Sequence, residues 1–225
     1  MSTTADPITE MEAHEHVEDN PHDDFPTPLL LAQAICRRLA ETVHEPLRIV
    51  EPSANDGVFL ACARETWPGA RLIAVELQPK YEAALRERAD GVLIGDWLAF
   101  AQLIAERGGA NLILGNPPYK PAEAHIRAAL RALPPGGVLA LLLRINFVAG
   151  IERALGLWQE FPPSDVHPIA QRPSFRKNKK GKRSSDMTEY GLYVWVHPQP
   201  GEPWPEHTRL HTKRSLVWRE RGRRT

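Results

Sequence analysis

Short apolar segments alternate with amphipathic ones from residue 28 to residue 161, and this alternation limits the possible folds more than any other feature. Strands that are apolar throughout and separated by helices are typical of a parallel sheet with helices on both faces. We expect helices at 28–42, 58–66, 80–88, 97–107, 122–132 and 151–161. We expect strands at 47–50, 72–75, 92–94, 111–114 and 137–143.

Two further strands, 165–170 and 191–196, are separated by a loop at 172–187 that has no helical pattern. Without a crossover helix, two such strands can pair only antiparallel. The sequence therefore predicts an α/β fold with a mostly parallel, seven-stranded sheet and an antiparallel edge hairpin. Thr27 and Pro28 are expected to supply the cap and the first turn of the first helix.

The formal net charge of zero conceals a strong asymmetry. Residues 1–24 contain eight acidic residues and no lysine or arginine, so the remainder has 28 basic and 20 acidic residues. We expect a disordered acidic tail at 1–24 and one folded domain, which carries the candidate site, at 25–198. We expect a second tail at 199–225 that is first proline-rich and then basic. The basic excess of the remainder favours a polyanionic partner.

The chain has no apolar run long enough to cross a membrane, and its start has no basic, signal-like region. The two cysteines, Cys36 and Cys62, lack metal-ligand spacing and are interpreted as reduced core residues. We therefore expect a cytoplasmic, monomeric protein with no metal and no membrane partner.

Acidic side chains follow the first three expected strands, where open α/β sheets bind ligands. Glu51 opens a turn of small residues, and Glu76 and Asp96 follow the next two strands. No GxGxxG or P-loop is present, which disfavours a dinucleotide or a nucleoside triphosphate. Carboxylates at two consecutive strand ends suit the ribose and adenine of an adenosine that carries positive charge elsewhere, such as S-adenosylmethionine. The alternative is that Glu76 and Asp96 merely cap helices.

The fourth strand is followed by Asn116, Pro117, Pro118 and Tyr119. The prolines stiffen the turn and remove two donors, so the Asn116 side-chain oxygen and the Pro117 carbonyl remain as acceptors. Two acceptors that grip an exocyclic amino group would free its lone pair and stabilise the developing positive charge. The Tyr119 ring would stack on the base. A rigid turn or a WW-domain ligand is the alternative for an isolated tetrapeptide of this kind.

Together these motifs resemble the amino-methyltransferases of DNA, in the order of the gamma group of N6-adenine enzymes and in a small, phage-like form. The resemblance covers residues 25–195. It implies a Rossmann-like methyltransferase fold and S-adenosylmethionine as cofactor. It places the catalytic role on Asn116, Pro117, Pro118 and Tyr119. The cofactor-binding positions that we expect are Thr27, Pro28, Glu51, Pro52, Ser53, Ala54, Glu76, Leu77, Asp96, Trp97 and Asn116.

Two departures from that family are visible. Asn55 stands where the family usually has glycine, and we expect the turn to tolerate it because asparagine adopts positive φ more readily than most residues. Only 30 residues follow Trp195, so we expect no separate target-recognition domain in this chain.

The loop at 172–187 carries seven basic residues in twelve positions, which predicts contacts with backbone phosphates. Phe175 would form a second wall for a flipped base. The alternatives are a hydrophobic anchor for Phe175 and a merely solvated loop. The substrate-binding residues that we expect are Arg172, Phe175, Arg176, Lys177, Lys179, Lys180, Lys182 and Arg183.

The sequence thus predicts methylation of the N6 amino group of adenine in DNA, by base flipping and direct transfer. Three alternatives stay open. An RNA base or a protein glutamine could be the acceptor, since glutamine methyltransferases of release factors share the tetrapeptide, and N4 of cytosine is a lesser option. The chain could also bind cofactor or nucleic acid without catalysis.

Overall fold

The computed structural model describes residues 26–173, 175–177, 183–184, 188–206 and 208–210. The expected acidic tail at 1–24, the end of the basic tail at 211–225 and three of the expected phosphate-binding residues, Lys179, Lys180 and Lys182, lie outside the described residues. Of Arg176, Lys177 and Arg183 only the backbone is described.

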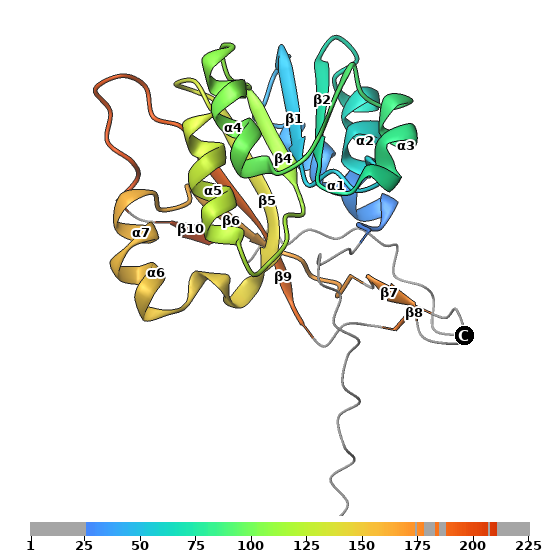
Figure 1. The fold of residues 1–225 in the computed structure, drawn as a ribbon. Helices are drawn as coiled ribbons and strands as arrows, with labels where there is room; N and C mark the ends of the chain where they lie inside the picture. Colours follow the sequence, from blue (N-terminus) through green and yellow to red (C-terminus); the bar gives the residue numbers. More distant parts are fainter. Residues whose placement is uncertain (1–25, 174, 178–182, 185–187, 207, 211–225) are drawn as a thin grey trace, which may run out of the picture.

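A twisted sheet in the order β10-β6-β9-β5-β4-β1-β2-β3 forms the centre of the protein (Figure 1). The five neighbouring strands from one edge inward, β3, β2, β1, β4 and β5, are all parallel. Strand β9 is antiparallel to both β5 and β6. The mostly parallel, seven-stranded sheet with an antiparallel edge hairpin is therefore confirmed, and a two-residue strand, β10, extends it beside β6. The strands are β1 (Arg48–Pro52), β2 (Arg71–Glu76), β3 (Gly91–Ile94), β4 (Leu112–Gly115), β5 (Val138–Arg144), β6 (Asp165–Pro168), β9 (Tyr190–Val196) and β10 (Arg209–Leu210).

Helices cover both faces of the sheet (Figure 1). Helices α1 (Leu29–Ala40), α2 (Val58–Thr66) and α3 (Glu82–Arg86), the last preceded by a 3-10 turn η1 (Pro79–Tyr81), contribute to one apolar cluster. Helices α4 (Trp97–Glu106), α5 (Ala122–Arg131) and α7 (Leu157–Glu160) contribute to the other. None of the helices in the described part of the chain is long and apolar enough to cross a bilayer.

Each central strand supplies both clusters because successive side chains point to opposite faces. In β1, Ile49 joins the cluster under α1 and α2, whereas Val50 joins the cluster under α4 and α5. All residues of β5 except its last, Arg144, are buried. Strands buried on both faces must be apolar throughout, which explains the patternless apolar runs of the sequence.

Two local predictions were wrong. The helix expected at 151–161 is interrupted at Gly156, so that α6 (Ile151–Leu155) and α7 follow a 3-10 turn, η2 (Ile145–Val148). Pro28, not Thr27, is the N-cap of α1, and no side chain caps that helix. The loop at 172–187 contains a two-residue antiparallel pair, β7 (Arg176–Lys177) with β8 (Arg183–Ser184).

The chain beyond residue 198 also contacts the domain. Trp204 packs edge-on against Phe161, with ring centroids 5.3 Å apart, and β10 pairs with β6. These contacts lie past the boundary expected at residue 198.

The order of the strands reverses between β1 and β4, which lie side by side in parallel. Such a switch point opens a crevice beyond the carboxyl ends of the two strands, where open α/β sheets bind ligands. Glu51 in β1 and Asn116 after β4 therefore belong to neighbouring strand ends. Gly115 permits their close approach, because a Cβ atom there would lie 3.2 Å from the Pro52 carbonyl oxygen and 3.6 Å from the Glu51 side chain.

Candidate active site

The turn between β1 and α2 is built from residues in the left-handed region of backbone conformation. Ser53, Asn55 and Gly57 have φ values of 58°, 51° and 77°. Asn55 holds this conformation and its side-chain oxygen accepts a 2.9 Å hydrogen bond from the backbone N–H of Asp56. The expectation that the turn tolerates asparagine here is therefore confirmed.

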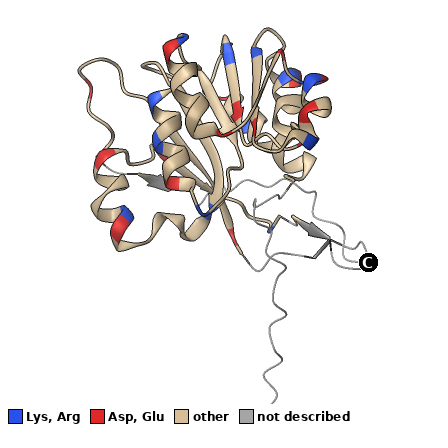
Figure 2. Cartoon of the chain, viewed as in Figure 1, with Lys and Arg blue, Asp and Glu red and all other residues tan. Residues whose placement is uncertain are grey.

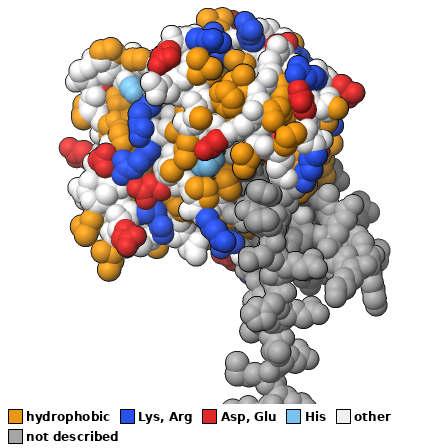
Figure 3. Space-filling model, viewed as in Figure 1, with side chains coloured by type: hydrophobic (Ala, Val, Ile, Leu, Met, Phe, Trp, Pro, Cys, Tyr) orange, Lys and Arg blue, Asp and Glu red, His pale blue; other side chains and the backbone are white. Residues whose placement is uncertain are grey.

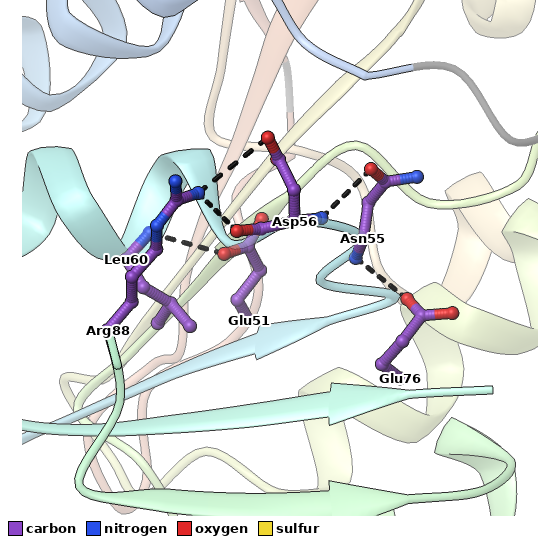
Figure 4. Close-up of polar contacts among 6 residues, drawn as sticks. All are labelled: Glu51, Asn55, Asp56, Leu60, Glu76 and Arg88. Carbon is purple, nitrogen blue, oxygen red and sulfur yellow. Dashed lines mark hydrogen bonds and ion pairs between the residues drawn. The ribbon is translucent and has the colours of Figure 1, made fainter. Parts of the chain in front are cut away.

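Two buried carboxylates hold this turn from neighbouring strands (Figure 4). Glu51 accepts a hydrogen bond of 3.2 Å from the backbone N–H of Leu60, in the first turn of α2, where amides lack partners within the helix. Glu76 accepts one of 2.7 Å from the backbone N–H of Asn55 and one of 2.8 Å from that of Gln78. The acidic residues that the sequence singled out thus shape the loop between them.

Burial raises the pKa of Glu51 well above its ordinary value, and the nearby carboxylates of Asp56 and Glu76 raise it further. The hydrogen bond from Leu60 acts in the opposite direction but is a smaller influence. A buried carboxylate without a positively charged neighbour is costly. The site therefore favours a ligand that brings positive charge close to Glu51.

A third contact anchors the turn from the opposite side. The Arg88 guanidinium donates a short hydrogen bond to the backbone carbonyl of Asp56 and lies 3.6 Å from the Asp56 carboxylate (Figure 4). Gly57 packs so closely on Leu85 that a Cβ atom would lie 2.9 Å from the leucine side chain. Arg88 and Leu85 thus hold this turn from the side of α3.

The three predicted cofactor-binding residues that follow β2 and β3 differ in their exposure and in their hydrogen bonds. Asp96 is exposed and caps α4, because its Oδ1 accepts a 3.0 Å hydrogen bond from the backbone N–H of Leu98. Asp96 therefore caps the helix, as the alternative interpretation predicted, and uses one of its two carboxylate oxygens to do so. Trp97 is buried, and its indole N–H donates to the carbonyl of His125, so its ring belongs to the core. Leu77 is 54% exposed beside Glu76 and presents an apolar side chain at the strand end.

The amide of Asn116 lies between two hydroxyl groups. Its Nδ2 donates to Thr27 Oγ1 at 3.3 Å, and its Oδ1 accepts a 3.0 Å hydrogen bond from the Tyr119 hydroxyl. Thr27 is buried, and burial raises the pKa of Tyr119 well above its ordinary value. The structure thus brings Thr27 together with Asn116, which lies 89 positions later in the sequence, and with Tyr119.

Aromatic rings extend this group toward the basic loop. The ring centroids of Tyr119 and Tyr190 lie 5.9 Å apart, and those of Tyr190 and Phe175 lie 5.0 Å apart in an edge-on arrangement. Phe175 is buried, as the hydrophobic-anchor alternative requires, and it reaches Tyr119 through Tyr190. Arg172 is exposed and its guanidinium lies 3.3 Å from the carboxylate of Glu189.

Sequence reasoning missed three residues of this region. Tyr190 and Arg88 carry no recognisable signal, because one belongs to an ordinary apolar strand and the other to a helix end. Arg144 did carry one: it is the charged residue that closes the apolar strand β5 at the same edge as Asn116.

No protein-family model matches the chain. The type II methyltransferase M.XamI of Xanthomonas campestris pv. amaranthicola is 37% identical over 83 residues, which are 33% of this chain and 15% of the relative. The type II methyltransferase M.CvrRI of Paramecium bursaria Chlorella virus XZ-6E is 26% identical over 113 residues, which are 48% of this chain and 28% of the relative. The chain therefore spans less than a third of either relative.

Solved structures share the fold over most of the chain. TrmN from Thermus thermophilus matches 75% of this chain and 48% of its own with a TM-score of 0.55 at 24% identity. A protein from Listeria monocytogenes described as a class I S-adenosylmethionine-dependent methyltransferase matches 84% of this chain and 65% of its own, with a TM-score of 0.61 at 12% identity. The M protein of the type I restriction enzyme EcoKI matches 84% of this chain and 48% of its own, with a TM-score of 0.60 at 13% identity.

At these identities the structural likeness concerns the fold alone, and it agrees with the strand order and the antiparallel β9 described above. The chain has the Rossmann-like fold of the S-adenosylmethionine-dependent methyltransferases.

Proposed function

We propose that this chain transfers a methyl group from S-adenosylmethionine to the exocyclic N6 amino group of adenine in DNA. The observation that carries the proposal is the Asn116 amide, which is held between Thr27 and Tyr119 at the switch point of the sheet. Gly115, the preceding residue, lies against Glu51 and Pro52 of the neighbouring strand.

The residues around β1 and β2 fit the cofactor. S-adenosylmethionine carries a sulfonium and an ammonium group. Either positive charge, placed near Glu51, would offset the burial that raises the pKa of this carboxylate. Glu76 is fixed by two backbone N–H groups, and its carboxylate oxygens have further lone pairs for ribose hydroxyls. Leu77 offers an exposed apolar side chain to an adenine ring, and Asp96 keeps one oxygen for its amino group. When bound, the cofactor supplies an electrophilic methyl group.

The tetrapeptide after β4 would then orient the acceptor. The Asn116 Oδ1 accepts a hydrogen bond from Tyr119 and would also accept an amino hydrogen of the substrate. The Pro117 carbonyl would take the other hydrogen, so that the nitrogen lone pair turns toward the methyl group. Both acceptors also stabilise the positive charge that develops on the nitrogen. Thr27 fixes the amide so that its oxygen, not its nitrogen, faces Tyr119.

Two observations favour a nucleic acid as substrate. The relatives that match parts of the chain are named type II methyltransferases, and the sequence places seven basic residues beside Phe175.

An RNA base would suit the same acceptors, and is the second outcome of the substrate assay. Basic and acidic side chains are mixed on the face that carries α4 and α5, so this face does not present the basic surface that a nucleic acid requires (Figures 2 and 3).

The replacement Asn116→Ala tests the proposal. It removes the acceptor but leaves Glu51 and Glu76 in place, so we expect a loss of methyl transfer of about 100-fold or more. Cofactor affinity, measured by calorimetry, should change only a few-fold. The matched control is Gln102→Ala, which removes an exposed amide on α4 whose partner is Glu106. Turnover that survives in Asn116→Ala, or an equal loss in Gln102→Ala, would remove Asn116 from this role.

A further inference from the structure

Arg144 stands at the carboxyl end of β5, one strand away from Asn116 in the sheet. Its register partner on β9 is Tyr190. Residues directly opposite each other in an antiparallel pair point to the same face of the sheet. Arg144 and Tyr190 therefore lie together, and both contact Tyr119.

The guanidinium group of Arg144 contacts the face of the Tyr119 ring. Its central carbon lies over the ring, 5.1 Å from the centroid. The N–H donors of a guanidinium lie in its plane and point outward from its edge. Arg144 is exposed, and among the described residues no carboxylate pairs with it and no acceptor takes its side-chain hydrogens.

Other arginines of the domain are engaged differently. Arg127 binds the carboxylates of Glu123 and Glu160, and Arg88 binds the Asp56 backbone. Arg48 donates to the carbonyl oxygens of Arg107 and Gly109. The N–H donors of these guanidinium groups bind groups of the fold, whereas the Arg144 guanidinium lies over the Tyr119 ring at the edge of the site.

We propose that Arg144 is a substrate-binding residue whose N–H edge holds the backbone phosphate next to the target nucleotide. This inference rests on the proposed function, because Tyr119 must be the ring that receives the base. A guanidinium edge matches a phosphate in a two-point geometry, and the contact with Tyr119 would hold Arg144 beside the base. One residue would thereby tie the position of the nucleic-acid backbone to that of the base.

The test compares Arg144→Gln and Arg144→Lys with the unaltered protein. The probe is a fluorescein-labelled single-stranded oligonucleotide that contains adenine, and its anisotropy is followed over a range of salt concentrations. We expect Arg144→Gln to weaken binding about tenfold at low salt. The slope of log K against log salt should fall by about 0.7, the value for one phosphate contact on a single strand. Arg144→Lys should keep the slope but bind more weakly, because its point charge lacks the planar edge.

The control variant is Arg131→Gln. Arg131 is exposed at the end of α5. The carbonyl of the next residue, Ala132, accepts a hydrogen bond from the backbone N–H of Ala110, just before β4 begins. Arg131 therefore lies near the amino end of β4, whereas the site lies beyond its carboxyl end. Its replacement should leave both affinity and slope unchanged. Equal slopes in Arg144→Gln and the unaltered protein would overturn the inference, as would a change confined to S-adenosylmethionine affinity, which would assign Arg144 to the cofactor.

The same measurements separate this inference from the proposed function. If the protein binds the oligonucleotide through Arg144 but methylates no DNA, the phosphate contact stands and the reaction is wrong. If it methylates DNA with the same KM in Arg144→Gln, the reaction stands and the phosphate contact is wrong. If it neither binds nor methylates the oligonucleotide, both are wrong.

Discussion

Glu51→Gln should stabilise the protein while weakening its cofactor site. The Glu51 side chain is buried, and burial raises its pKa well above the ordinary value of 4.5. Since the folded state holds the proton more tightly than the unfolded state, the stabilisation is complete below pH 4.5 and is lost as the pH rises through the folded pKa. Glutamine is neutral at every pH and can still accept the hydrogen bond from Leu60.

We expect Glu51→Gln to gain about 1–2 kcal/mol at pH 8, the cost of a poorly compensated buried polar group. For a domain of this size that corresponds to an increase of about 2–8 °C in Tm. The assay is thermal unfolding at pH 4 and at pH 8, each with and without S-adenosylmethionine. The difference should vanish at pH 4, and the added cofactor should raise the Tm of the variant less than that of the unaltered protein. A variant that is no more stable at pH 8, or that responds equally to the cofactor, would refute this reasoning.

Replacements at Asn55, Tyr119 and Gly115 test the positioning of the site. Asn55→Val should lose about 1–2 kcal/mol of stability in a denaturant titration, because a β-branched residue is strained at φ 51°, whereas Asn55→Gly should not show this strain. Tyr119→Phe removes the hydroxyl that orients Asn116 but keeps the ring, so kcat should fall by up to about tenfold while the affinity for the oligonucleotide is unchanged. Gly115→Ala should lower both the Tm and the calorimetric affinity for S-adenosylmethionine, because its Cβ would crowd the Pro52 carbonyl, and a normal Tm would contradict the close approach of β1 and β4.

The fold could be predicted from the sequence because its strands are buried on both faces. A short apolar run such as the one that forms β5, bounded by turn residues, is typical of a covered strand, and the missing crossover helix before β9 left only an antiparallel pairing. The interruption at Gly156 could not be foreseen, since Ile151, Leu155 and their neighbours fit one helix as well as two. A single glycine within a helical pattern is often tolerated, and tertiary packing decides the outcome.

The candidate site was predictable where the topology decides it. Glu51, Glu76 and Asn116 follow strands, so a parallel sheet brings them to one edge whatever the details of packing. What the sequence could not show is how the side chains pair. Thr27 looked like a helix cap but binds Asn116, and Arg144, whose place at the end of an apolar strand is visible in the sequence, lies over Tyr119. Such contacts depend on side-chain directions across strands that are distant in sequence.

The identity of the methylated atom decides whether the protein is a DNA adenine methyltransferase. The protein is incubated with methyl-labelled S-adenosylmethionine and unmethylated DNA, the DNA is digested to nucleosides, and the labelled nucleoside is identified by chromatography and mass spectrometry. We expect label on N6-methyldeoxyadenosine, with none in the Asn116→Ala reaction. Label on N4-methyldeoxycytidine, label found only when RNA or protein replaces DNA, or no label from a protein that binds the cofactor would contradict it.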